Sequence, residues 1–98
     1  MFIVGWYIYA NLYYGHISLE WNANQERDIA GYKIYYGSSS RSYSNIMIIK
    51  LTEQSQVNVV RYNLSYLEKN KKYYIAVTAY NRYGLESSYS NEVEGYAR

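Results

Sequence analysis

The chain of 98 residues contains no cysteine, no proline and a single histidine. Without cysteine there are no disulfides and no thiolate metal ligands, so packing alone has to stabilise the fold. His16 stands by itself, and because two or more converging ligands define a metal site, we expect a surface side chain there. Charge is also sparse: ten Lys and Arg against eight Asp and Glu give a net charge of +2. The basic residues are scattered along the chain, which does not favour nucleic acid binding.

Long hydrophobic runs are missing as well. The most apolar segment, residues 2–10, is far shorter than the roughly 20 residues that a membrane-spanning helix needs. No basic residue precedes it, so it is a poor match to a signal peptide. We therefore expect no membrane insertion and predict a first strand over residues 4–10 instead.

The residue patterns that carry catalysis are not found. Acidic pairs occur at Glu26 and Asp28 and at Glu92 and Glu94, but nothing in the sequence places a third oxygen ligand or an activated nucleophile beside either pair. Solvated loop and edge charges account for such pairs. We predict a protein that is not an enzyme and that has no catalytic residues, no cofactor and no metal.

Three stretches of the chain, in contrast, alternate large apolar residues with polar ones. Successive side chains of a strand point to opposite faces, so a period of two indicates strands that are buried on one side. The alternating positions are Ile17, Leu19 and Trp21; Tyr32, Ile34 and Tyr36; and Tyr73, Ile75, Val77 and Ala79.

Turn residues separate these and further short apolar segments, and no segment has a helical period. We predict one domain over residues 1–98, an all-β, seven-stranded, antiparallel immunoglobulin-like β-sandwich. The expected strands span residues 4–10, 16–22, 31–37, 46–51, 57–62, 73–81 and 91–96. Gly84 is expected to serve the last turn at a position that tolerates positive φ.

The segments HISLEW, DIAGYKIYYGSSSRSYSN and YNLSYLEKNKKYYIAVTAYNRYGLESSYSNEV resemble a fibronectin type III domain of microbial multidomain proteins. The resemblance implies the topology of that family and an extracellular or cell-surface location. In LEKNKK the Pro-Gly often seen in the family is missing, so we expect Asn70 to take the left-handed turn position. Tyr73 would be the tyrosine corner, with its hydroxyl bound to backbone. The implied structural core is Trp21, Tyr32, Ile34, Leu67, Tyr73, Ile75 and Val77.

Tyrosine is the abundant residue, with sixteen copies. Its ring suits half-buried sheet surfaces, and it also provides contact area in protein-binding loops. In a seven-stranded sandwich the second, fourth and sixth connections gather at one end. The residues that we expect to contact a protein partner there are Arg27, Arg82, Tyr83, Leu85 and Tyr89.

Two functions remain open from the sequence. The first is a non-catalytic spacer or protein-interaction unit of a larger secreted or surface protein. The alternative is a dedicated binding domain, natural or engineered, that uses the loop end or a tyrosine-rich sheet face. The uncharged segment 2–14 also predicts a homodimer through pairing or exchange of the first strand, since an unprotected edge strand is a template for pairing. The residues expected in that contact are Trp6, Ile8, Tyr9 and Leu12.

Overall fold

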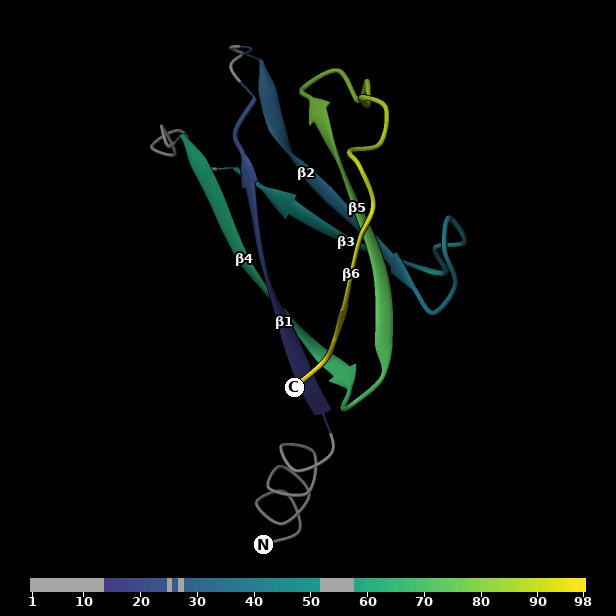
Figure 1. The fold of residues 1–98 in the computed structure, drawn as a ribbon. Coiled ribbons are helices and arrows are strands. Elements are labelled where there is room, and N and C mark those ends of the chain that lie inside the picture. Colours follow the sequence, from purple (N-terminus) through teal and green to yellow (C-terminus); the bar gives the residue numbers. More distant parts are fainter. Residues whose placement is uncertain (1–13, 25, 27, 52–57) are drawn as a thin grey trace, which may run out of the picture.

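The computed structural model describes residues 14–24, 26, 28–51 and 58–98, and in this part the chain forms β-strands and no helix (Figure 1). The predicted all-β class is confirmed. The first predicted strand, residues 4–10, lies outside the described residues. The strands are β1 Tyr14–Asn22, β2 Ile29–Gly37, β3 Asn45–Lys50, β4 Val59–Glu68, β5 Lys72–Asn81 and β6 Val93–Tyr96.

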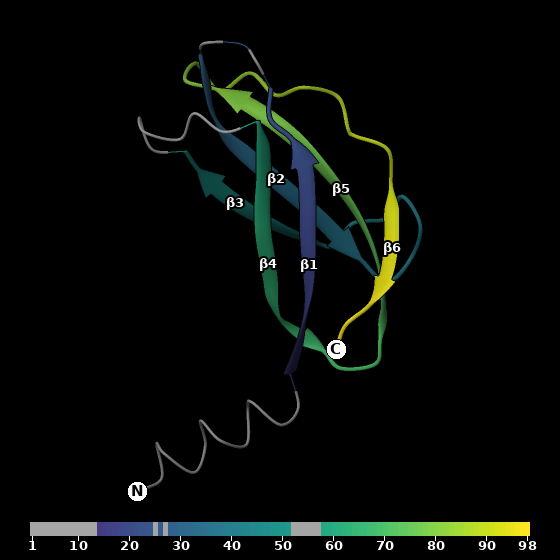
Figure 2. The ribbon, with the colours of Figure 1, turned by 60° about the vertical axis from the view of Figure 1, so that its left-hand side comes forward.

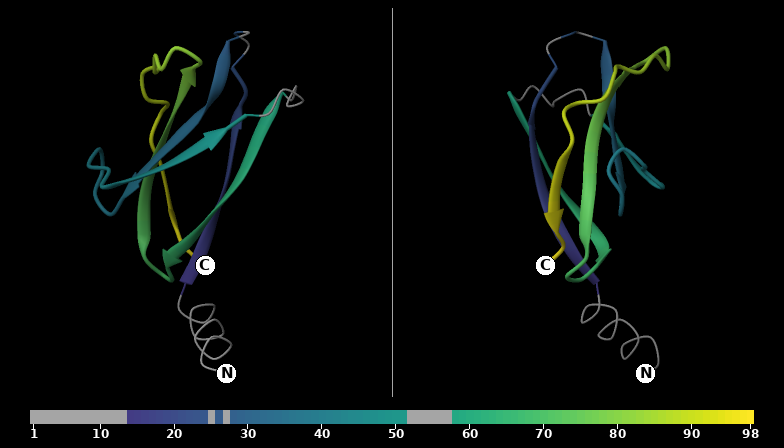
Figure 3. Two further views of the ribbon diagram at one scale, coloured as in Figure 1. Left: turned by 180° about the vertical axis from the view of Figure 1, so that it is seen from behind. Right: turned by 45° about the vertical axis from the view of Figure 1, so that its right-hand side comes forward.

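The strands form two antiparallel sheets that face each other. One sheet has the order β1-β4, and the other has the order β3-β2-β5-β6. Figure 2 shows β1 and β4 lying across the broader sheet, and the two views in Figure 3 show the same pair of layers from behind and from the side. This is the two-layer arrangement of a β-sandwich.

The core lies between the layers, where the alternating residues meet. Ile34 and Leu64 are fully buried, and Tyr32, Leu67, Tyr73 and Ile75 are almost so. Because β2 and β5 occupy the middle of the broader sheet, their inward residues have neighbours on every side. Trp21 and Val77 are only partly buried, but each packs against both clusters of core residues. The Trp21 ring meets the Tyr32 ring edge-on, with 5.3 Å between centroids.

β4 is longer than predicted. We expected a strand over 57–62, but β4 continues to Glu68 through an irregularity in its pairing with β1, where the register advances from Gly15↔Leu67 to Ile17↔Leu64. Tyr66 lies in this bulge with a φ of 61°, in the left-handed region. A bulge inserts an extra residue and breaks the period of two, so the alternation alone does not reveal the continuation.

The connection from β4 to β5 is a tight turn. Asn70 has a φ of 64°, as predicted, and its N–H donates to the carbonyl of Ala97 at 2.9 Å. The Tyr73 hydroxyl accepts a hydrogen bond from the backbone N–H of Glu68 at 2.9 Å. The chain end is fastened nearby, since His16 and Arg98 exchange two backbone hydrogen bonds of 3.2 and 3.1 Å. Within the described ranges, no helix has the length and hydrophobicity that a membrane span requires.

Candidate protein-binding surface

The turn that follows β5 is organised by one side chain. The Asn81 amide oxygen accepts hydrogen bonds from the backbone N–H groups of Tyr83 and Leu85, at 3.0 and 2.9 Å. Gly84 has a φ of 84°, which matches the expectation from the sequence. The turn leaves Tyr83 72% exposed, and the Arg82 guanidinium lies 5.4 Å from the centre of its ring.

After this turn the chain runs back beside β5, although residues 86–90 form no regular strand. Ser87 donates its N–H to the carbonyl of Ala79, and the Ala79 N–H donates to the Ser87 hydroxyl. Ser90 repeats this reciprocal pair with Val77. Two serine hydroxyls thus replace the carbonyls of a neighbouring strand, and they satisfy N–H groups of β5 that would otherwise lack an acceptor.

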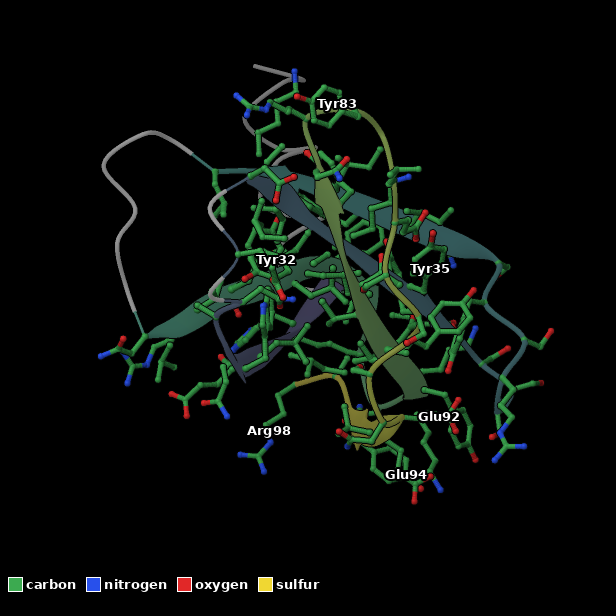
Figure 4. All side chains as sticks on the ribbon, turned by 90° about the horizontal axis from the view of Figure 1, so that it is seen from above. Tyr32, Tyr35, Tyr83, Glu92, Glu94 and Arg98 are labelled. Carbon is green, nitrogen blue, oxygen red and sulfur yellow. The ribbon has the colours of Figure 1, made fainter. Side chains whose placement is uncertain are left out.

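This course places Tyr89 over the broader sheet and away from the turn. Its ring meets the Tyr35 ring edge-on at 5.0 Å and the Tyr43 ring at 5.5 Å, and Tyr35 and Tyr43 are 6.2 Å apart. We call Tyr35, Tyr43 and Tyr89 the tyrosine cluster. Figure 4 shows Tyr35 on the sheet and Tyr83 well separated from it at the turn. Edge-to-face contacts of this kind are favourable and hold the rings in fixed orientations.

The carboxylate of Glu86 anchors the segment at its start. It accepts hydrogen bonds from the hydroxyls of Tyr35 and Thr78, the latter at 2.7 Å, and from the Lys33 ammonium at 3.2 Å. These donors favour the charged form, so the pKa of Glu86 is lowered, with the Tyr35 hydrogen bond as the largest cause. Burial, followed by the contact with Glu86, raises the pKa of Tyr35 to about 12.

Glu92 fastens the far end of the same segment to the connection between β2 and β3. Its carboxylate accepts hydrogen bonds from the Ser40 hydroxyl at 2.6 Å, the Arg41 N–H at 2.7 Å and the Tyr43 hydroxyl at 2.6 Å. The pKa of Glu92 is lowered, chiefly by the Ser40 hydrogen bond. Burial, followed by the bond to Glu92, raises the pKa of Tyr43 to about 12.

Exposed aliphatic residues continue the surface across the sheet. Ile46 and Ile48 of β3 are 53% and 57% exposed, and they stand opposite Tyr35 and Lys33 of β2. Tyr89 is 55% exposed. We call this side of the sheet, with Ile46, Ile48 and the tyrosine cluster, the outer face. It combines exposed apolar groups and fixed rings with the charged side chains of Lys33, Glu86 and Glu92, a mixture that is typical of protein-binding surfaces.

The solvent side of the smaller sheet has a different character. A shallow hollow of about 490 Å³ lies there, lined by Ser18, Leu19, Glu20, Arg61, Tyr62 and Asn63. Glu20 and Arg61 form an ion pair of 2.8 Å across it, and both side chains are largely exposed. Such exposed pairs contribute little energy. Around the hollow this side presents mainly polar groups, and the exposed rings of Tyr14 and Tyr66 form an edge-on pair on the same two strands.

The structure places the predicted protein-binding residues in two separate regions. Arg82, Tyr83 and Leu85 lie together at the turn after β5, whereas Tyr89 lies on the outer face. Arg27, Trp6, Ile8, Tyr9 and Leu12 are outside the described residues.

The sequence did not reveal the two rings that contact Tyr89, Tyr35 and Tyr43, nor the other residues on this side of the sheet: Ile46, Ile48, Glu86 and Glu92. Part of the signal was present, because Tyr35, Ile46 and Ile48 occupy the outward positions of alternating strands, where apolar residues are unexpected on a solvated face.

A comparison with curated proteins found no match to the chain. A comparison with protein-family models matched residues 11–96 to the fibronectin type III domain. The match covers both sheets of the sandwich, including β1 and β6. The chain therefore belongs to the fibronectin type III family.

Proposed function

We propose that this chain is a non-catalytic module of a larger extracellular or cell-surface protein, and that it binds a protein partner through the outer face of its four-stranded sheet. Membership of the fibronectin type III family supports a role in protein interaction or spacing. The observation that carries the more specific proposal is the tyrosine cluster, whose three rings come from separate segments and hold one another in place.

The outer face is better organised for binding than the turn after β5. Tyr35 and Tyr43 have their hydroxyls hydrogen-bonded to Glu86 and Glu92, so these rings lose little conformational entropy when a partner docks. At the turn, the ring of Tyr83 has a single contact within the described part of the chain, with the guanidinium of Arg82. Binding hot spots are typically fixed aromatic anchors that lie near the centre of a contact area.

A spacer without a dedicated partner is the second candidate function. It is favoured by the strength of the core, where Ile34, Leu64 and Ile75 are almost completely buried. The two functions differ in whether a partner protein contacts the outer face, because a spacer does not use the exposed part of this face for binding.

The test is carried out in the parent protein with a photo-crosslinking amino acid at Ile46 or, as a control, at Tyr83. We expect a partner protein to be crosslinked from Ile46 and not from Tyr83. Affinity for that partner is then measured for Tyr89→Ala and Tyr83→Ala, after circular dichroism has shown that both variants are folded.

Loss of a hot spot costs about 2 kcal/mol or more, roughly 30-fold in Kd, and we expect this for Tyr89→Ala only. Equal affinity of the Tyr89→Ala variant and the parent protein would rule out the outer face. Crosslinks to neighbouring domains alone would favour the spacer.

A further inference from the structure

β3 is an edge strand with one side of its backbone open. It pairs with β2 on one side, and in the described part of the chain no strand lies on the other. The Leu51 N–H donates to the carbonyl of Ala30, which fixes the alternation of the antiparallel pair. The backbone groups of Met47 and Ile49 therefore point to β2, whereas those of Ile46, Ile48 and Lys50 point away from the sheet.

The open side of β3 has few of the features that normally protect an edge, and the one charged residue of the strand is Lys50 at its end. Natural edge strands carry charges, proline or bulges that discourage pairing with another chain. From Asn45 to Ile49 this strand has no charge, no proline and no irregularity of register, and Ile46 and Ile48 are exposed.

The other edges of the two sheets are better protected. β4 carries Arg61 and Asn63 along its exposed side, and β6 is four residues long with Glu94 in it. At the start of β1, His16 is already paired with Arg98. β3 is thus the described strand most open to pairing, and its backbone fits an occupant that is itself a β-strand.

The sequence of β3 is complementary to itself. If a second copy is placed antiparallel with the two-fold axis at Ile48, Ile48 meets Ile48 of the second copy on the outer face, and Ile46 stands opposite Lys50 of the second copy. No like charges face each other, and the aliphatic stem of Lys50 covers an isoleucine. A register centred on Lys50 would instead oppose two ammonium groups, so the Ile48 register is favoured over that one.

We propose that this chain forms a homodimer in which β3 pairs antiparallel with β3 of a second copy, so that the two four-stranded sheets become one continuous sheet. An interface of this kind is isologous and closes after two copies, because each β3 edge is consumed by the other. The exposed isoleucines are then covered. The proposal goes beyond the binding function proposed above. The dimer covers Ile46 and Ile48 of the outer face but leaves Tyr89 free for a partner, so self-association and the affinity of the Tyr89→Ala variant test the two proposals separately.

The full chain is tested by light scattering and sedimentation velocity from micromolar to millimolar concentration. We expect a concentration-dependent dimer for the unchanged protein. Ile48→Lys places two lysines opposite each other at the axis and should yield a monomer. Ile48→Pro retains an apolar side chain but removes the outward N–H, so it should also yield a monomer if strand pairing, rather than general stickiness, drives association.

Two controls make the outcome decisive. Val93→Lys alters an exposed residue of β6 and should leave the dimer intact, and Ile8→Lys tests the alternative contact through the N-terminal segment. Amide exchange should also slow at Ile46 and Ile48 at high concentration and not in dilute solution. A protein that is monomeric throughout, or a dimer that survives both Ile48 variants while remaining folded, would overturn the proposal.

Discussion

The Tyr73 hydroxyl lies 2.9 Å from the backbone N–H of Glu68 and accepts its hydrogen bond. This contact ties the first inward residue of β5 to the last residue of β4, across the turn at Asn70. The Tyr73 ring is buried beside the Tyr36 ring, 6.2 Å away edge-on, and the Lys71 ammonium lies 5.6 Å from its centre. One side chain therefore fixes both the path of the turn and the packing at the base of the sandwich.

Tyr73→Phe should destabilise the protein by about 1–2 kcal/mol, because the ring is retained but the Glu68 N–H loses its acceptor. Urea unfolding followed by circular dichroism measures this change. Tyr96→Phe serves as the control, since Tyr96 is exposed and its hydroxyl has no hydrogen bond to a described residue. Identical unfolding midpoints for the two variants would show that the hydroxyl of Tyr73 has no structural role.

Ser87→Ala and Ser90→Ala should each cost about 1 kcal/mol, because each removes the acceptor for one N–H of β5. The effect is local, so amide exchange should accelerate at Ala79 in the first variant and at Val77 in the second. Ser88→Ala, between the two, should change neither amide. Unchanged exchange in the Ser87 and Ser90 variants would argue that water serves these N–H groups equally well.

Tyr66 has a φ of 61°, a conformation that costs a non-glycine residue roughly 1–2 kcal/mol. Tyr66 is 77% exposed, and among the described residues its ring meets only that of Tyr14, so these contacts compensate little of the strain. We expect Tyr66→Gly to be about 1 kcal/mol more stable than Tyr66→Ala in urea unfolding. In a regular strand alanine is the better residue, so the reverse order would show that the backbone of the bulge is not strained.

Stability should decrease at both ends of the pH scale. The pKa values of Glu86 and Glu92 are lowered in the folded state, so their contribution is complete above about pH 4.5 and is lost as the pH falls through the lowered values. Tyr35 and Tyr43 have pKa values raised from 10.0 to about 12, so their contribution is complete below pH 10 and is lost as the pH rises toward 12.

Urea midpoints measured across the pH range check this behaviour. Glu86→Gln combined with Glu92→Gln should flatten the acid side of the stability profile, because the amides do not titrate there. If the urea midpoint of the double variant still falls as steeply at acidic pH, other carboxylates cause the loss of stability.

The N-terminal segment carries a prediction of its own. Trp6→Ser with Ile8→Lys should lower the apparent mass in light scattering if residues 2–14 mediate self-association, because a charge at the strand edge discourages pairing. Tyr83→Ser is the matched control away from this segment. A monomeric mass for the unchanged chain over a wide concentration range would count against the prediction.

Much of the sandwich could be predicted from the alternation of residues. Tyr32, Ile34 and Ile75 stand at inward positions of strands that lie in the middle of the broader sheet, so hydrophobic period and burial coincide. The end of β4 could not be predicted in this way, because the bulge at Tyr66 shifts the period where a turn also fits.

The outer face was harder to predict because it depends on three segments that are distant in the chain. Tyr89 stands between serines in a stretch typical of turns, and nothing local shows that it folds back on Tyr35 and Tyr43. Its position depends on the reciprocal hydrogen bonds of Ser87 and Ser90, whose partners in β5 are known only from the three-dimensional structure. The sequence therefore indicated a tyrosine-based contact at the loop end or on a sheet face, but it did not show that Tyr89 lies against Tyr35 and Tyr43.

Next to β5, the hydroxyls of Ser87 and Ser90 accept the hydrogen bonds that backbone carbonyls accept in a regular strand. In a regular strand the hydrogen bonds are made by backbone groups, which nearly every residue has. A substitution therefore seldom removes a single hydrogen bond between two strands. In residues 86–90, removal of one serine hydroxyl deletes one of the two hydrogen bonds that this serine makes with β5, and its backbone hydrogen bond stays in place. Single serine substitutions can therefore weaken the attachment of Tyr89 to the sheet in small steps, while the backbone keeps its course.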